Sequence, residues 1–172
     1  MTRILGIDPG SNITGYGIID IKDNHATHIS HGKICTGDVE LAVKLSTVFE
    51  KITSIIDEFR PEEVAVEKVF MHRNADSALK LGQARGAVIS ACALQKIPVF
   101  EYTPNQIKQA VVGKGHAAKQ QVQHMVKVLL CLDRIPETDA ADALAIALCH
   151  AHSRTGMQRM YMAGNLRRGR LR

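Results

Sequence analysis

Four acidic residues occupy positions at which a metal-dependent enzyme could place its ligands. Asp8 and Glu67 each end a short apolar run, and Asp139 and Asp142 are three positions apart. In the first turn of a helix, the last two would project from one face. Carboxylates that crowd in a cleft repel one another unless a cation offsets their charge, and Mg²⁺ prefers hard oxygen ligands. The four acids therefore predict a divalent-metal site.

The chemistry expected of such a site is phosphodiester hydrolysis. Two metal ions about 4 Å apart bind the attacking and the leaving oxygens during in-line displacement. One ion orients and deprotonates water, and the other stabilises the charge on the leaving 3′ oxygen. We therefore predict a nuclease with two Mg²⁺ ions per active site, for which Mn²⁺ substitutes.

Each acid also has an ordinary structural explanation. Asp139 and Asp142 could favour a helix N-terminus, because anions interact well with the helix dipole there. Asp8 could form an Asx-turn before Pro9, and Glu67 could simply be solvated. The metal site is favoured because these independent explanations would not bring all four acids to one edge of one sheet.

Hydrophobic periodicity predicts the elements that position the acids. Helical spacing is clearest at 40–59, where Arg60-Pro61 ends the pattern. The predicted strands are 3–8, 13–20, 28–36, 63–67 and 98–102, and the predicted helices are 40–59, 74–95, 104–112, 117–132 and a last one from Thr138.

This order of elements predicts an α/β fold. The first three strands form an antiparallel meander, and the later strands alternate with helices, which implies a mixed sheet with helices on both faces. A right-handed crossover through the helix at 40–59 places the strand at 63–67 parallel to the strand at 3–8. Asp8 and Glu67 then meet at one edge, where open sheets of this kind form their sites.

Composition indicates one globular domain with a basic tail. The chain has 172 residues, of which 45% are apolar, enough to bury a sizeable core. We expect the domain to span residues 1–155 and residues 156–172 to form a flexible basic tail. No apolar run approaches the ~20 residues that span a bilayer, and no signal peptide is evident, so we expect a cytoplasmic protein without membrane contact.

The net charge of +5 comes from the C-terminus. Residues 154–172 contain six arginines and no acid, which leaves 16 basic and 17 acidic residues in 1–153. Two local basic stretches remain, at 68–96 and 103–132. They fit either a nucleic-acid surface or ordinary solvated helix faces.

The cysteines and histidines suggest no metal site of their own. Cys35, Cys92, Cys131 and Cys149 lack CxxC spacing and are predicted to be buried free thiols. None of the eight histidines has a convincing ligand spacing, and His25, His28 and His31 would alternate between the faces of a strand.

Several motifs resemble the RuvC family of Holliday-junction resolvases. They are Gly6-Ile7-Asp8-Pro9-Gly10, Thr14-Gly15-Tyr16-Gly17, Val66-Glu67-Lys68-Val69-Phe70, the block from Asn74 to Gly86, and Asp139-Ala140-Ala141-Asp142-Ala143-Leu144-Ala145-Ile146-Ala147. The resemblance runs from residue 4 to about 152, and the central block is its most specific part.

The resemblance implies a ribonuclease H-like fold and a homodimeric, Mg²⁺-dependent endonuclease that nicks two opposed strands of a four-way junction symmetrically. It implies that Asp8, Glu67, Asp139 and Asp142 bind the metal. Some family members carry His at the last position, whereas this chain has Asp. The resemblance also implies the branch-migration proteins RuvA and RuvB as partners.

Further residues gain a role in DNA binding from this resemblance. Phe70 would stack on an unpaired base, a contact of ~1–3 kcal/mol; without the resemblance it would be read as a core residue. Lys108, Lys114 and Lys119 would contact phosphates, and Arg73 and Tyr16 are lesser candidates for backbone contacts. Ala78, Gly82 and Gly86 form a stripe of small residues that the resemblance assigns to the dimer interface, whereas packing against the sheet is the ordinary alternative.

Three other functions fit parts of the sequence. An actin-like kinase uses a similar Asp-Gly turn, but 172 residues leave no room for its second lobe. A non-catalytic DNA-binding module would not need four converging acids, which oppose DNA binding unless a metal offsets them. A ribonuclease acting on RNA–DNA hybrids is the nearest alternative, and it would be indifferent to four-way geometry.

Overall fold

A five-stranded mixed sheet forms the centre of the computed structural model, which describes the backbone of residues 1–68 and 75–168 and the side chains as far as Arg154. The strand order is β3-β2-β1-β4-β5. The strands are β1 (Thr2–Asp8), β2 (Ile13–Lys22), β3 (His25–Cys35), β4 (Glu63–Glu67) and β5 (Val99–Tyr102).

The pairing is antiparallel between β1 and β2 and between β2 and β3. It is parallel between β1 and β4 and between β4 and β5. The antiparallel meander, the parallel strands and the helices on both faces confirm the predicted α/β class.

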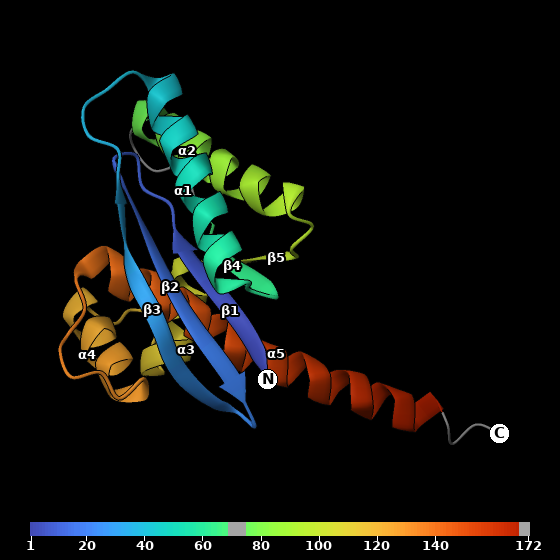
Figure 1. The fold of residues 1–172 in the computed structure, drawn as a ribbon. Helices are drawn as coiled ribbons and strands as arrows, with labels where there is room; N and C mark the ends of the chain where they lie inside the picture. The colour runs from blue at the N-terminus through green and yellow to red at the C-terminus, as the bar shows by residue number, and fades with distance from the viewer. Residues whose placement is uncertain (69–74, 169–172) are drawn as a thin grey trace.

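Helices cover both faces of the sheet (Figure 1). On one face lie α1 (Leu41–Phe59) and α2 (Ala75–Leu94); on the other lie α3 (Pro104–Val112), α4 (Lys119–Leu129) and α5 (Thr138–Arg168). Alternate residues of each strand serve the two faces. Leu5 and Ile7 pack with α1 and α2, whereas Ile4 packs with α3, α4 and α5.

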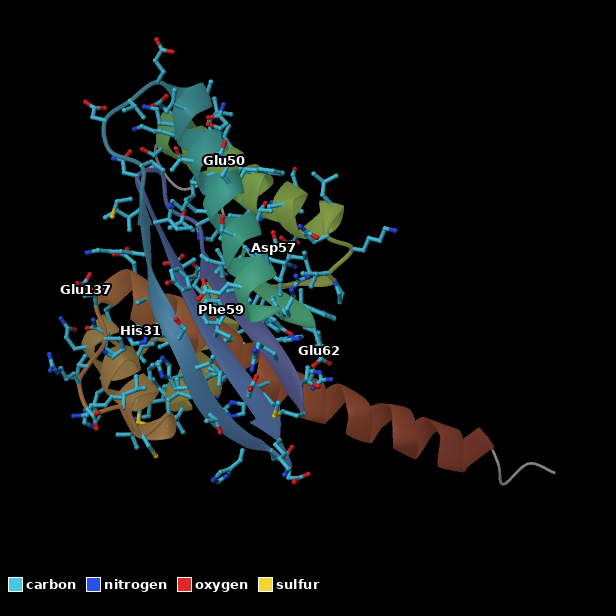
Figure 2. The ribbon with its side chains drawn as sticks, viewed as in Figure 1. His31, Glu50, Asp57, Phe59, Glu62 and Glu137 are labelled. Carbon is cyan, nitrogen blue, oxygen red and sulfur yellow. The ribbon has the colours of Figure 1, made fainter. Side chains whose placement is uncertain are left out.

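Local chemistry explains where the elements end. Arg60 takes a left-handed conformation after α1, and Pro61 prevents the helix from continuing. Arg3 then ties three elements together: its Nε lies 2.7 Å from Asp20 Oδ1 of β2, and its Nη1 donates to the Phe59 carbonyl over 2.8 Å. Figure 2 shows Phe59 and Glu62 beside this turn, which delivers the chain into β4.

The last helix is longer than the predicted domain. Its backbone continues to Arg168, across residue 155, where we expect the folded domain to end. The division into a domain at 1–155 and a flexible tail at 156–172 stays a prediction. Within the described residues, no helix is long and apolar enough to cross a membrane.

Two expectations about side chains are wrong. Cys92 and Cys149 are buried free thiols, but Cys35 and Cys131 are exposed, because they lie at a strand end and in the turn after α4. His28 and His31 do not alternate between faces: their Nε2 and Nδ1 atoms lie 2.7 Å apart. A bulge between the pairs Ile18–Ser30 and Ile19–His28 leaves Ile29 unpaired and moves both histidines to one face.

Candidate active site

Glycines of β1 and β2 allow α5 to lie directly against the sheet. A Cβ built on Gly6 would lie 2.1 Å from the Ala143 carbonyl oxygen, and one on Gly15 would lie 2.0 Å from the Asp139 carbonyl oxygen. No other residue type fits at these two positions without moving the helix backbone. The glycines of the N-terminal hairpin therefore form the surface against which the start of α5, with Asp139 and Asp142, packs.

This close approach brings three predicted acids together. Asp8 and Glu67 end the adjacent parallel strands β1 and β4, and Asp142 reaches them from the first turns of α5. They line a cavity of about 310 Å³ together with Lys108, Lys119, Pro104, Ile107, Val122 and Ile146. The crossover argument from the sequence placed Asp8 beside Glu67 correctly.

The electrostatics of this cavity favour a cation. Burial, reinforced by Glu67 and Asp142, raises the pKa of Asp8 to about 8. Burial also raises the pKa of Glu67 and that of Asp142. Asp8 and Glu67 share a hydrogen bond, so one proton reduces the repulsion between them. The three carboxylates cannot all ionise at neutral pH without a compensating positive charge.

The chain itself supplies one such charge. Lys119, the first residue of α4, places its Nζ 2.9 Å from Asp142 Oδ2. This ion pair raises the pKa of Lys119, so the side chain stays cationic. Lys108 of α3 also lines the cavity. Its helix begins with a capping box, in which Thr103 Oγ1 accepts from the Gln106 N–H and the Gln106 side chain accepts from the Thr103 N–H.

Asp139 takes a more peripheral position than the other three acids. It does not line the cavity, although its charge acts on Asp142 and Lys119. Among the described residues, no group of three or more His, Cys, Asp or Glu side chains has the arrangement of a formed metal site. The donor set nevertheless fits Mg²⁺, because it is made entirely of carboxylate oxygens, and burial raises the pKa values of Asp8, Glu67 and Asp142.

The predicted DNA-binding residues divide into three groups. Lys108 and Lys119 line the acidic cavity, whereas Lys114 is exposed in the turn between α3 and α4 and does not. Tyr16 lies against Gly32 of β3. Phe70 and Arg73 lie outside the described residues, so their predicted roles stay untested.

One charged residue near the site was not anticipated. Lys33 of β3 pairs with Glu137, just before α5, and it also feels the charge of Asp139. Figure 2 shows Glu137 at the start of this helix. The signal was present in the hairpin register, because Lys33 lies opposite Gly15, the residue against which Asp139 packs.

Comparison with known proteins identifies the family to which this chain belongs. The family model "Crossover junction endodeoxyribonuclease RuvC" matches residues 4–150. The chain belongs to the RuvC family. The crossover junction endodeoxyribonuclease RuvC of Pseudoalteromonas translucida (strain TAC 125) is 53% identical over 173 residues, covering 100% of this chain and 99% of the relative. That of Marinobacter nauticus is 54% identical with the same coverage.

Solved RuvC structures share the fold. Thermus thermophilus RuvC in complex with a Holliday junction substrate is 38% identical, with a TM-score of 0.85 over 91% of this chain and 97% of the other. The yeast mitochondrial Holliday junction resolvase, at 13% identity and a TM-score of 0.62, covers 87% of this chain and 79% of its own and is similar in fold alone. The resemblance to RuvC and the predicted ribonuclease H-like architecture are both confirmed.

Proposed function

We propose that this protein is a structure-selective endodeoxyribonuclease that resolves Holliday junctions by paired, symmetric nicks, in recombination and DNA repair. The observation that carries the proposal is the cavity in which Asp8, Glu67 and Asp142 converge beside Lys108 and Lys119. Carboxylates alone would repel DNA. Carboxylates flanked by lysines suit a site that binds metal ions and a phosphodiester together.

Asp8, Glu67 and Asp142 would hold the metal ions, with Asp139 joining them from the preceding turn of the helix. When bound, two Mg²⁺ ions would activate the attacking water and neutralise charge on the leaving 3′ oxygen. The charges of both Glu67 and Asp142 act on Asp8, so Asp8 is the acid that would contribute most centrally to holding the metal ions. Mn²⁺ would substitute, because it prefers the same oxygen ligands.

The lysines near the acids would bind the phosphate of the DNA. Lys119 would exchange Asp142 for a phosphate oxygen when metal ions take over the carboxylate. Lys108 would hold the phosphodiester from the neighbouring helix, and both cations would stabilise the negative charge that develops during displacement. Lys114, further from the acids, would contact the DNA backbone away from the cleaved bond.

The paired nicks require a homodimer. On α2, a Cβ added at Gly82 or Gly86 would meet no described atom within 4 Å beyond its own stretch of helix, and Leu79 is 62% exposed. This small-residue face is therefore open to a second copy, not packed against the sheet. A two-fold dimer would present two active sites to the two-fold symmetric strands of one junction.

The wider setting is part of the same proposal. Phe70 and Arg73 would contact DNA at the junction centre, RuvA and RuvB would act with the protein on four-way DNA, and the protein would work in the cytoplasm.

Cleavage of defined substrates tests the function. The protein would be offered labelled four-way junction, duplex, single strand and RNA–DNA hybrid, with and without Mg²⁺, and the nicks would be mapped. We expect paired symmetric nicks on the junction alone, only with metal. Cleavage of the hybrid with indifference to the junction would identify a ribonuclease instead, and metal-independent binding without cleavage would identify a DNA-binding module.

A further inference from the structure

A buried polar network joins α5 to β4 and β5 at a distance from the acidic cavity. His150 of α5 is fully buried, with 0% of its surface exposed. Its Nδ1 lies 2.7 Å from the Tyr102 hydroxyl, and its Nε2 lies 2.7 Å from Glu63 Oε2. Arg154 Nε, one turn further along, lies 2.8 Å from the same oxygen.

The chemistry of the partners fixes the roles in this network. An ionised Glu63 can only accept, so Nε2 of His150 carries the proton and donates. Nδ1 is then the acceptor for the Tyr102 hydroxyl. The ring also stacks on Phe100, with centroids 4.4 Å apart. Both ring nitrogens have a partner and one ring face is stacked, so the orientation of the imidazole is constrained.

The network reaches from Tyr102, which pairs with Glu67 at the end of the sheet that carries the acids, to Glu63 at the other end of β4. Glu63 and Glu67 are the first and last residues of β4 and lie on one face of it, about 13 Å apart. Asp142 and His150 are eight residues apart on α5, which is about 12 Å along the helix. Because α5 runs antiparallel to β4, the matched spacing pairs His150 with Glu63 and Asp142 with Glu67.

The rest of the contact between α5 and the sheet is apolar. Between Asp142 and His150, the helix presents Ala143 and Ala147 to Gly6, and Leu144 lies against Gly17. These side chains hold the helix close to the sheet without any directional bond. Hydrogen bonds are directional, so the polar network specifies the rotation and height of the helix more sharply than this apolar packing does.

We infer that His150 is a positioning residue that, through Tyr102 and Glu63, sets the place of Asp142 relative to Asp8 and Glu67 and thereby sets the affinity of the site for divalent metal. This inference rests on the proposed metal-dependent function. It concerns residues that do not line the acidic cavity.

The test measures Mg²⁺ binding separately from cleavage. For wild type, His150→Gln and Tyr102→Phe, the rise in Tm with increasing Mg²⁺ gives an apparent affinity, and junction cleavage gives a second one. We expect both variants to need ~3–10 times more Mg²⁺ by both measures, less than the 10–100-fold typical when a direct partner of a ligand is removed. Cleavage at saturating Mg²⁺ should return to within about twofold of wild type.

A matched control separates positioning from general destabilisation. Leu148→Ala removes a buried side chain from the same helix without touching the network, and it should lower the Tm while leaving the Mg²⁺ requirement unchanged. An equal shift in Leu148→Ala, or no shift in Tyr102→Phe, would overturn the inference. Tyr102→Phe decides the matter if His150→Gln does not fold, because it removes only a hydroxyl.

The two proposals fail in distinguishable ways. If wild type binds Mg²⁺ but does not cleave junctions, the proposed function is wrong, while the Tm measurements still judge the role of His150. If wild type shows no Mg²⁺-dependent rise in Tm and Asp8→Asn behaves in the same way, the metal site is disproved. The proposed role of His150 is then disproved with it.

Discussion

The carbonyl oxygen of Asp139 occupies the space into which a side chain at position 15 would project, 2.0 Å from an ideal Cβ on Gly15. Gly15 of the hairpin and Asp139 of α5, more than 120 residues apart in the chain, thus pack directly against each other. A residue that carries no functional group therefore decides whether Asp139 and Asp142, two of the proposed metal ligands, can approach the strand ends.

Gly15→Ala should therefore damage the site without altering any charged group. We expect a loss of about 1–3 kcal/mol in the free energy of unfolding, as for other overpacked positions, and a large loss of junction cleavage. Urea unfolding and a cleavage assay measure the two effects. Gly115→Ala is the control, because its nearest neighbour would be 3.7 Å away, and it should leave both quantities unchanged.

Asp8→Asn should abolish cleavage and yet stabilise the metal-free protein in alkaline buffer. The pKa of Asp8 is raised from 3.8 to about 8, so the folded state disfavours the ionised form. Wild type therefore loses stability relative to the variant as pH rises from about 4 to 8, and the difference is complete above pH 8. We expect roughly 1–3 kcal/mol at pH 8.5, after discounting for water in the open cavity.

Thermal unfolding with and without Mg²⁺ checks this prediction. Mg²⁺ should raise the Tm of wild type and leave that of Asp8→Asn nearly unchanged, while junction binding persists in both. Retained cleavage by the variant would refute the metal assignment, and a lower Tm at pH 8.5 would refute the raised pKa of Asp8.

Lys119→Met should separate catalysis from metal affinity. Removing the cation that stabilises the reacting phosphate should lower kcat about 10²-fold. The same change frees Asp142 from its 2.9 Å ion pair, so half-maximal Tm stabilisation should need less Mg²⁺. Lys127→Met, on the same helix but outside the cavity, should change neither. A higher Mg²⁺ requirement in Lys119→Met would show that the lysine does not compete with metal.

Acid should destabilise the protein partly through His150. Burial lowers the pKa of this histidine, although its hydrogen bond with Glu63 opposes the effect. The folded state therefore favours the neutral ring, and stability falls as pH drops below about 6.5, the unfolded value, towards the lower folded value. The difference in Tm between wild type and His150→Gln should therefore become smaller as the pH is lowered from 7.5 to 5. A constant difference would contradict this.

Gly82→Gln should prevent the proposed dimer while leaving the fold intact. A Cβ added at Gly82 would meet no described atom within 4 Å, so we expect the fold to accommodate the new side chain, which would obstruct a second copy. Sedimentation should show a monomer with unchanged circular dichroism, and cleavage should yield single nicks. A normal dimer would place the interface elsewhere.

Much of the fold could be predicted from the sequence because its signals are local. Apolar periodicity located the helices and strands to within a few residues, and the handedness of the crossover at 40–59 placed Glu67 beside Asp8. Features that depend on tertiary contacts could not be predicted. The bulge at Ile29 reverses the expected face of His28, and only the strand register reveals it.

The site was predictable in its residues more than in its geometry. Equivalent spacing arguments applied to Asp139 and Asp142, yet only Asp142 lines the cavity, because the backbone of Asp139 is pressed against Gly15. Lys33 and His150 had no motif of their own. Their partners are Glu137 in one case and Glu63 and Tyr102 in the other, and these pairings exist only after the sheet and α5 have assembled.

The position of α5 at the end of the folded core also affects when the enzyme becomes active during synthesis. The ribosome synthesises the chain from its N-terminus, and a domain generally folds as a unit once it has emerged. A nascent chain that has released β1 and β4 holds Asp8 and Glu67 but still lacks Asp139 and Asp142. Half of the acids are thus absent until the last helix is free to pack, so under the proposed function an incomplete chain would be unable to nick DNA.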